Sequence, residues 1–364
     1  MKKALILFGG VSSEHDISLI SAKSVIENTP KDKYDIITVG ITKDGRWYLY
    51  TGDVENLPED KWLCDESRLT SAVLSPDRAD HGIIVLGEKA EKIKVDVVFP
   101  VLHGKNGEDG AVQGLLQLAG IPFVGCDMIS SACCMDKVIT NTLLDEAGIA
   151  QAKWLGLKEH EYKENGEEFI KKAEEYLGYP IFVKPANAGS SVGVSKATDK
   201  ESLKKAIDKA FKEDTKLVLE EGITGKEIEC AVLGNEEPIA SLVGEIESCN
   251  DFYDYDAKYN DPDGAELLIP ARLEEDKLEE IRSLAKKAYA ALDLCGLSRV
   301  DFFMDKDSSE IYLNEINTMP GFTQISMFPK MCAKFGLDFT ALTELLMNEA
   351  LLKFEAASKL KTSR

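Results

Sequence analysis

Short apolar runs separated by helical patterns dominate the first third of the chain. The opening KKALILFGG reads as a buried strand ending in a glycine turn, and residues 12–27 continue with helical spacing. VDVVFPVLHG (95–104) and IPFVG (121–125) read as two further strands. This alternation of strands and helices predicts an α/β domain with a parallel, doubly wound sheet over residues 1–125. The less regular stretch 42–92 is interpreted as an elaboration of that domain.

The pattern changes after Gly125 and predicts a central domain at 126–222. ACCMDKVITNTLLDEAGI has the apolar spacing of a single helix, and residues 199–213 predict an amphipathic, lysine-rich helix. YPIFVKPA (179–186) and KLVLEEGI (216–223) read as strands on either side of that second helix.

A C-terminal domain is predicted at 223–364. Strands are expected at EIECAVLG and PIASLVGEI, and RVDFFM with EIYLNEIN is expected to form a hairpin. Helical patterns cover 274–293 and the tail from residue 338. An acidic and aromatic loop, residues 248–266, interrupts the domain and is a candidate active-site lid.

Composition restricts the function classes. The chain has 364 residues and a formal net charge of -21, which argues against binding the outside of a nucleic-acid duplex. No apolar run approaches the roughly 20 residues of a membrane span, and the first residues lack a signal-peptide pattern. The eight cysteines form no C-x-x-C pair, so we interpret them as reduced thiols. These features predict a cytoplasmic protein that binds neither nucleic acid nor membrane.

The predicted hairpin carries the strongest chemical signal. Residues two apart in a strand share a face, so Arg299 points with Asp301, and Glu315 points with Asn317. Across the turn these four side chains are expected to meet. The oxygen atoms of Asp301, Glu315 and Asn317 suit Mg²⁺, which binds one or two carboxylates together with phosphate and water. The alternative is a solvated, salt-bridged sheet face, which the following TMPGFTQIS does not favour.

Four segments have weaker signals that are ambiguous when each is taken alone. In KPANAGSSVGV (184–194) a lysine ends a strand and a Gly/Ser loop follows, which could cradle phosphate or simply be flexible. The glutamates of LVLEEGI could contact adenine or ribose, or lie at a solvated strand end. GGVSSEHDIS and HGKNGEDG follow strands of the first domain, at the edge where open sheets bind ligands.

Taken in order, the motifs resemble one family. GGVSSEHDIS, HGKNGEDG, MDK, VKPANAGSSVGV, EEGITGKE, FYDYDAKY, SRVDFF and LNEINTMPGFTQIS together resemble the D-alanine–D-alanine ligases of the ATP-grasp superfamily. The resemblance implies three domains, with ATP between two antiparallel sheets, and two Mg²⁺ ions for which Mn²⁺ is a substitute. It implies ligation of two D-alanine molecules through a D-alanyl phosphate, with release of ADP and phosphate, for peptidoglycan synthesis. A cytoplasmic homodimer is also implied.

The resemblance assigns residues to ATP and metal by matching positions. Lys137 and Lys184 match phosphate contacts, and Lys258 matches a lysine that reaches the terminal phosphate. The adenine-binding strand is matched by Glu220, Glu221 and Ile223, and the ribose contact by Glu227. The ligands of the two metal ions are matched by Asp301, Glu315 and Asn317.

Other matches concern the two D-alanine molecules. Glu14 matches the acid that holds the first ammonium group, with Ser190 and Tyr259 as partners in a loop-closing triad. His103 and Glu108 match residues that support this pocket. Arg299 and the backbone of Gly321 match the oxyanion site. Ser326 matches a contact to the carboxylate of the second D-alanine.

Three alternatives stay open at this point. The nearest is another ATP-grasp ligase, such as a D-alanine–D-lactate ligase, from which Tyr259 within FYDYDAKY would distinguish this chain. A nucleotide-dependent oxidoreductase would fit the opening strand, but the G-x-G-x-x-G fingerprint is missing. A pure amino-acid-binding module would not need the cluster of Asp301, Glu315 and Asn317.

Overall fold

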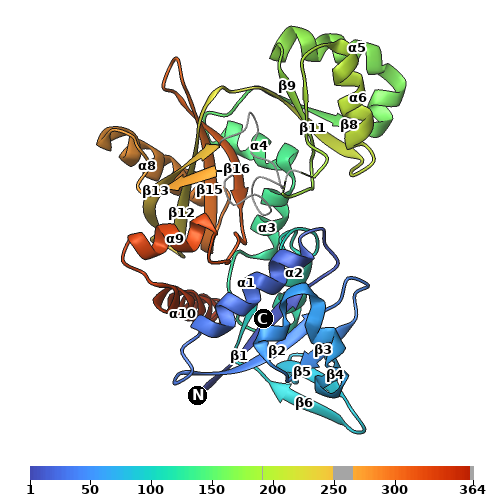
Figure 1. Ribbon diagram of the computed structural model, residues 1–364, viewed down its shortest axis with the longest axis vertical. Helices are drawn as coiled ribbons and strands as arrows, with labels where there is room; N and C mark the ends of the chain where they lie inside the picture. Colours follow the sequence, from blue (N-terminus) through green and yellow to red (C-terminus); the bar gives the residue numbers. More distant parts are fainter. Residues whose placement is uncertain (191, 249–264, 361–364) are drawn as a thin grey trace.

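The N-terminal sheet is built on three parallel strands (Figure 1). The computed structural model describes residues 1–190, 192–248 and 265–360. Strand β1 (Lys2–Gly9) lies between β2 (Tyr34–Ile41) and β7 (Val97–Pro100) and pairs in parallel with both. Six consecutive β1 residues from Ala4 are buried, as expected for a central strand covered on both faces. Helix α1 (His15–Asn28) packs on this strand, which confirms the predicted opening strand and helix.

Residues 42–92 extend the same sheet with antiparallel strands. The sheet order is β6-β5-β4-β3-β2-β1-β7, so the domain sheet is mixed rather than wholly parallel. Three 3-10 segments lie between β3 and β4, and Trp62 in the second of them packs edge-on against Phe8 at 5.1 Å between ring centroids. The added elements are β3 (Trp47–Tyr50), η1 (Val54–Asn56), η2 (Pro58–Cys64), η3 (Glu66–Arg68), β4 (Leu69–Leu74), β5 (Gly82–Leu86) and β6 (Ala90–Lys94).

Two expectations for the following region were wrong. IPFVG forms only one bridge, between Val98 and Phe123, because Pro122 has no N–H and Gly125 turns the chain at φ 104°. The single helix expected in ACCMDKVITNTLLDEAGI is two helices, α3 (Met128–Met135) and α4 (Lys137–Glu146). Asp136 separates them because its backbone is extended and its carboxylate caps α4 by accepting from the N–H of Ile139 at 3.2 Å.

The second sheet is small and antiparallel. Its order is β10-β9-β11-β8, with helices α5 (Glu159–Leu177) and α6 (Lys200–Ala210) packed against it. The strands are β8 (Trp154–Lys158), β9 (Ile181–Pro185), β10 (Ser195–Ala197) and β11 (Lys216–Glu221). The predicted strands and the lysine-rich helix are confirmed, whereas α5 was not anticipated.

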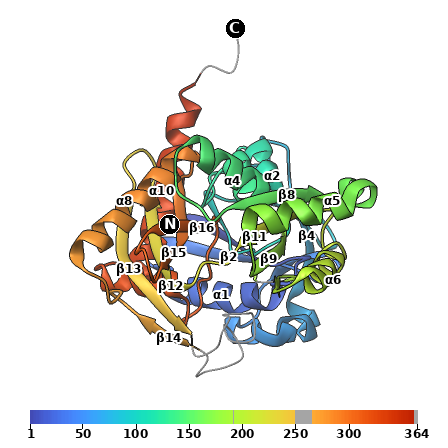
Figure 2. The ribbon, with the colours of Figure 1, turned by 90° about the horizontal axis from the view of Figure 1, so that it is seen from above.

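The third sheet has five antiparallel strands in the order β14-β13-β12-β15-β16. The predicted hairpin is its β15–β16 edge, and α8 (Glu275–Ala291) packs on β12 and β13. Viewed from above, the second sheet with its helices (green) lies beside the third sheet (yellow to orange) (Figure 2). The strands are β12 (Gly225–Gly234), β13 (Ile239–Ser248), β14 (Ala265–Leu268), β15 (Gly296–Asp305) and β16 (Ile311–Asn317).

Apolar packing crosses the predicted domain limits. Cys134 and Leu144, on α3 and α4, pack in the core of the third sheet with Val300. Helix α9 (Met327–Lys334) packs on β12 and β13, and α10 (Phe339–Ser358) returns to the N-terminal sheet at β7 and α1. The boundaries at 125/126 and 222/223 therefore stay predictions.

Two predictions from composition can be compared with the described residues. The seven cysteines in this part of the chain are all free thiols. None of the helices in the same part is long and apolar enough to span a bilayer.

Candidate active site

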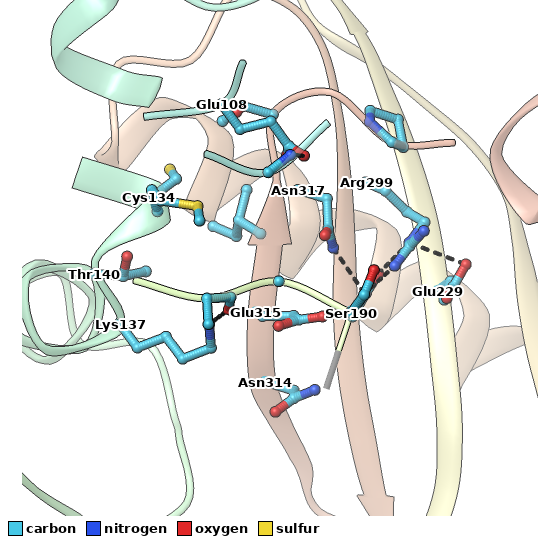
Figure 3. A pocket seen from close by; sticks show the side chains of 18 of the residues that line it. Glu108, Cys134, Lys137, Thr140, Ser190, Glu229, Arg299, Asn314, Glu315 and Asn317 are labelled. Atoms are coloured by element: carbon cyan, nitrogen blue, oxygen red, sulfur yellow. Dashed lines mark hydrogen bonds and ion pairs between the residues drawn. The ribbon is translucent and has the colours of Figure 1, made fainter. Parts of the chain in front are cut away.

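A pocket opens where the three sheets approach one another (Figure 3). It is lined by the loops after β1, β7 and β9 and by side chains from β12, β15 and β16. The structure therefore brings together most residues predicted from the sequence. Those lining this pocket are Glu14, His103, Glu108, Lys137, Lys184, Ser190, Glu227, Arg299, Asp301, Glu315, Asn317 and Gly321.

The hairpin face is arranged as the strand period predicts. Asp301 pairs with Glu315 across β15 and β16, and Arg299 pairs with Asn317. Arg299 donates from Nε to Asp301 Oδ1 at 2.7 Å and from Nη2 to Asp301 Oδ2 at 2.6 Å. Asn317 Nδ2 donates to Asp301 Oδ2 at 2.9 Å. The shared hydrogen bonds hold three functional groups in one fixed arrangement.

Glu229 belongs to this cluster, although the sequence argument missed it. It lies on β12 opposite Asp301, is 5% exposed, and has Oε2 3.1 Å from Arg299 Nε. Burial works against the charge of Arg299, but the nearby carboxylates of Asp301 and Glu229 outweigh it and raise the pKa of Arg299 well above its ordinary value. The signal was present in EIEC, because Glu227 and Glu229 are two apart and share a face.

Glu14 and Ser190 meet across the pocket from two different sheets. Glu14 lies at the N-terminus of α1 and accepts a hydrogen bond from Ser190 Oγ in the loop after β9. Two glycines leave room for the carboxylate. A Cβ atom on Gly104 would lie 2.5 Å from Glu14 Oε2, and one on Gly189 would lie 2.6 Å from it. The Glu14 carboxylate, which is predicted to hold the first D-alanine, is therefore enclosed by backbone on two sides.

Glu108 and His103 line the same pocket as Glu14. Glu108 Oε1 accepts from the N–H of Gly104 at 2.8 Å. Burial, followed by the charge of Glu14, raises the pKa of Glu108 to about 8. His103 is buried, with Nδ1 3.0 Å from the carbonyl of Met319 and Nε2 3.0 Å from Ser21 Oγ. These contacts join the loop after β7 to the segment that follows β16.

An adjoining pocket lies between the second and third sheets. Lys184 and Glu227 line both pockets, so the two spaces adjoin at these side chains. Lys184 Nζ lies 2.6 Å from Glu220 Oε2, and Lys137 Nζ donates to the carbonyl of Ala188 at 2.7 Å. Burial works against the charge of Lys184, but Glu220 outweighs it and raises the pKa of the lysine. The predicted adenine-side residues that line this second pocket are Glu220, Glu221 and Ile223.

Three predicted residues are not part of the described lining. Ser326 occupies the N-cap position of α9 without a side-chain capping bond, and a Cβ atom added at Gly321 would lie 2.7 Å from Ser326 Oγ. Its hydroxyl accepts from the N–H of Thr323 at 3.1 Å. Lys258 and Tyr259 lie outside the described residues, so their roles stay predictions.

Two antiparallel sheets facing a lysine- and carboxylate-lined pocket, next to an N-terminal α/β domain, define an ATP-grasp ligase fold. Solved structures agree with this class. The VanG D-Ala:D-Ser ligase from Enterococcus faecalis matches with a TM-score of 0.86 and 44% identity, covering 96% of this chain and 99% of that one. The D-alanine-D-alanine ligase from Coxiella burnetii matches with a TM-score of 0.85 and 33% identity, covering 99% and 98%.

The sequence comparisons identify the family. Residues 3–126 match the D-ala D-ala ligase N-terminus and residues 143–348 match the D-ala D-ala ligase C-terminus. The D-alanine--D-alanine ligase of Caldicellulosiruptor bescii is 49% identical over 363 residues, covering 100% of this chain and 98% of the relative. That of Thermoanaerobacter pseudethanolicus is 51% identical over 350 residues, covering 96% of each. The chain belongs to the D-alanine–D-alanine ligase family.

Proposed function

We propose that the chain joins two D-alanine molecules at the expense of ATP, through a D-alanyl phosphate, for peptidoglycan precursor synthesis. Family membership supports the reaction. The observation that carries the assignment of residues is the pocket itself, where the Glu14–Ser190 contact faces the cluster of Arg299, Asp301 and Asn317. The proposed ammonium site and the proposed phosphate-transfer site would thus share one space.

ATP is proposed to lie between the second and third sheets. Adenine would occupy the pocket beside Glu220, Glu221 and Ile223, with ribose at Glu227 and phosphates toward Lys137 and Lys184. Lys184 and Glu227 line both pockets, which supports a ligand that runs from one into the other. Lys258 is proposed to reach the terminal phosphate.

The lining of the first pocket fits divalent cations. Among its described residues are six carboxylate side chains, on Glu14, Glu108, Glu227, Glu229, Asp301 and Glu315, but three cationic ones, on Lys137, Lys184 and Arg299. A polyphosphate entering this acidic pocket requires added positive charge. Asp301, Glu315 and Asn317 would hold two Mg²⁺ ions, or Mn²⁺, through hard oxygen ligands. When bound, these ions supply neutralisation of the phosphate charge.

The protein's own groups then orient the two substrates. Glu14 holds the ammonium group of the first D-alanine. The carboxylate of this D-alanine then attacks the terminal phosphorus of ATP, and ADP leaves. The amine of the second D-alanine attacks the acyl carbon, and phosphate leaves. Arg299 and the backbone N–H of Gly321 would stabilise the negative charge that develops on the acyl oxygen. Ser326 is proposed to contact the second carboxylate, and Tyr259 to close the site with Ser190.

A D-alanine–D-serine ligase is the second candidate. The observation that favours it is the 44% identity and nearly complete coverage of the Enterococcus faecalis D-Ala:D-Ser ligase structure. The two candidates share every step up to the acyl phosphate and differ only in the acceptor.

Phosphate release from ATP with D-alanine, D-serine, D-lactate and L-alanine tests the proposal. We expect ADP, phosphate and D-alanyl-D-alanine, with L-alanine a poor substrate. AMP and pyrophosphate as products would exclude an acyl-phosphate mechanism, and preferred use of D-serine as the acceptor would support the second candidate. Size-exclusion chromatography and cell fractionation test the proposed homodimer and its cytoplasmic location.

A further inference from the structure

We propose that His15 and Asp60 form a positioning pair that holds the Glu14 loop, and that His15 acts in its doubly protonated form. The inference rests on the proposed function, because the loop is argued to receive the first D-alanine. It assigns a role to the 42–92 region, which supplies Asp60 and lies outside the pocket lining. Neither residue is argued to touch substrate.

Both ring nitrogens of His15 face hydrogen-bond acceptors. Nδ1 lies 2.7 Å from the carbonyl oxygen of Gly10, and Nε2 lies 2.9 Å from Asp60 Oδ1. A backbone carbonyl cannot donate, and Asp60 Oδ1 already accepts from Trp62 Nε1 at 3.1 Å. The ring is 1% exposed, so water is poorly placed to replace a lost partner. Only the imidazolium form, which donates from both nitrogens, satisfies this geometry.

The charges around His15 balance in the same protonation state. Asp16 follows it on α1, Asp60 comes from η2, and Lys43 comes from the turn after β2. Lys43 Nζ lies 2.8 Å from Asp16 Oδ1 and 3.4 Å from Asp60 Oδ2. Two carboxylates are therefore matched by two cations when His15 is charged. Burial alone would raise the pKa of Asp60, but the hydrogen bond from His15 and its charge lower it.

The pair acts on Glu14 through the backbone of its loop. His15 immediately follows Glu14, and its ring reaches back to Gly10, which closes the loop from 10 to 15. Ser12 Oγ also accepts from the N–H of Glu14, at 3.1 Å. The Glu14 carboxylate has little freedom, because added Cβ atoms on Gly104 and Gly189 would approach its Oε2 within 2.5 Å and 2.6 Å. A small shift of this loop would therefore displace the carboxylate.

The local backbone indicates that Asp60 is held in place by its side-chain contacts. Glu59 and Asp60 have φ values of 61° and 56°, in the left-handed region that residues with a Cβ rarely adopt. Trp62, two residues later, is fully buried against Phe8 and Tyr50. The indole fixes the segment on the sheet, and the Asp60 side chain reaches from it to α1.

The test is the Michaelis constant for the first D-alanine in wild type and Asp60→Asn, measured together with kcat and the Michaelis constant for ATP. Asparagine tolerates positive φ and keeps an acceptor, but it removes the negative charge that pairs with His15. We expect the constant for the first D-alanine to rise about threefold or more in the variant, because the charge-assisted bond that supports the Glu14 loop is weakened.

Glu59→Gln is the matched control, because Glu59 lies in the same turn but is exposed and paired with Lys61. Its Michaelis constant for the first D-alanine should equal that of wild type, and the constant for ATP should be unchanged in both variants. An unchanged constant for the first D-alanine in Asp60→Asn would overturn the proposal, as would an equal change in the constant for ATP.

His15→Gln provides a second, independent arm. Glutamine can donate to only one of the two acceptors, so the Michaelis constant for the first D-alanine should rise while the constant for ATP stays unchanged. If this variant does not fold, the Asp60→Asn constants decide alone. Wild-type ligation measured beside the variants separates failure of this inference from failure of the proposed function.

Discussion

The Glu229 carboxylate lies 3.1 Å from Nε of Arg299, on the neighbouring strand of the third sheet. Asp301 holds the same guanidinium from β15, so Arg299 is fixed from two sides. Glu229→Gln keeps the shape and removes one of these charges. We expect kcat to fall by roughly 10- to 100-fold with a smaller change in the Michaelis constant for ATP, because Arg299 is proposed to stabilise transition-state charge. Glu237→Gln, in the exposed turn after β12, is the control. Equal kcat values for Glu229→Gln and wild type would show that Glu229 is dispensable.

The space around Glu14 gives a second prediction. In Gly189→Ala, the new Cβ would lie 2.6 Å from Glu14 Oε2 and must displace the carboxylate. We expect at least a tenfold rise in the Michaelis constant for the first D-alanine, corresponding to about 1.4 kcal/mol, with an unchanged melting temperature. Gly87→Ala is the matched control, because a Cβ atom added there would have its nearest neighbouring atoms at 3.8 Å and Gly87 does not line the pocket. An unchanged constant in Gly189→Ala would contradict the role given to Glu14.

The third prediction concerns Glu315. It faces Asp301 across β15 and β16 and is proposed to bind both metal ions. Glu315→Gln should cut turnover by about 100-fold or more, the scale of losing one electrostatic group in a transition state. Mn²⁺ binding, followed by electron paramagnetic resonance in the presence of ATP, should weaken in parallel. Normal Mn²⁺ affinity with normal turnover would mean that the hairpin face is only a salt-bridged surface.

The raised pKa of Glu108 predicts that the free energy of unfolding depends on pH. Its pKa is raised to about 8 in the folded protein, by burial and by Glu14, so folding favours its protonated form. This contribution is complete below the unfolded value near 4.5 and is lost as pH rises through about 8. Glu108→Gln imitates the protonated state. Its free energy of unfolding should therefore exceed that of wild type increasingly from about pH 5 to pH 8, by at least about 1 kcal/mol.

Urea unfolding across that pH range measures the difference. Glu88→Gln, at an exposed position between β5 and β6, should remain parallel to wild type throughout. A Glu108→Gln curve parallel to wild type would show that Glu108 is already ionised in the folded protein.

Local periodicity was sufficient to predict the hairpin cluster. Arg299 and Asp301 share a face because they are two apart, and the polar turn sets their partners on β16. The same reasoning applied to EIEC would have found Glu229. The contact between Glu14 and Ser190 could not be found in this way, because it joins loops of two different sheets. Only the resemblance to the family pointed to it.

The misjudged elements were those with weak or competing local signals. AEKIK, the sequence of β6, is mostly exposed, so it lacks the alternation that marks a half-buried strand. Asp136 lies inside a continuous apolar pattern, and its capping of α4 is a local preference that the pattern conceals. The role of Asp60 could not be predicted for another reason: its partner His15 is distant in the chain, and Asp60 itself lies in none of the motifs that resemble the family.

Helix α10 has a consequence for how the chain is made. Leu342, Leu346 and Met347 of this helix are buried in the same core as β1 and β7, and Thr343 Oγ1 donates to the carbonyl of Asn28. Helix α10 therefore covers a sheet whose strands β1 and β7 are synthesised well before it. While translation proceeds, that apolar surface stays exposed until about residue 350 has left the ribosome. Premature termination before Phe339 should yield an aggregation-prone product rather than a smaller, well-behaved domain.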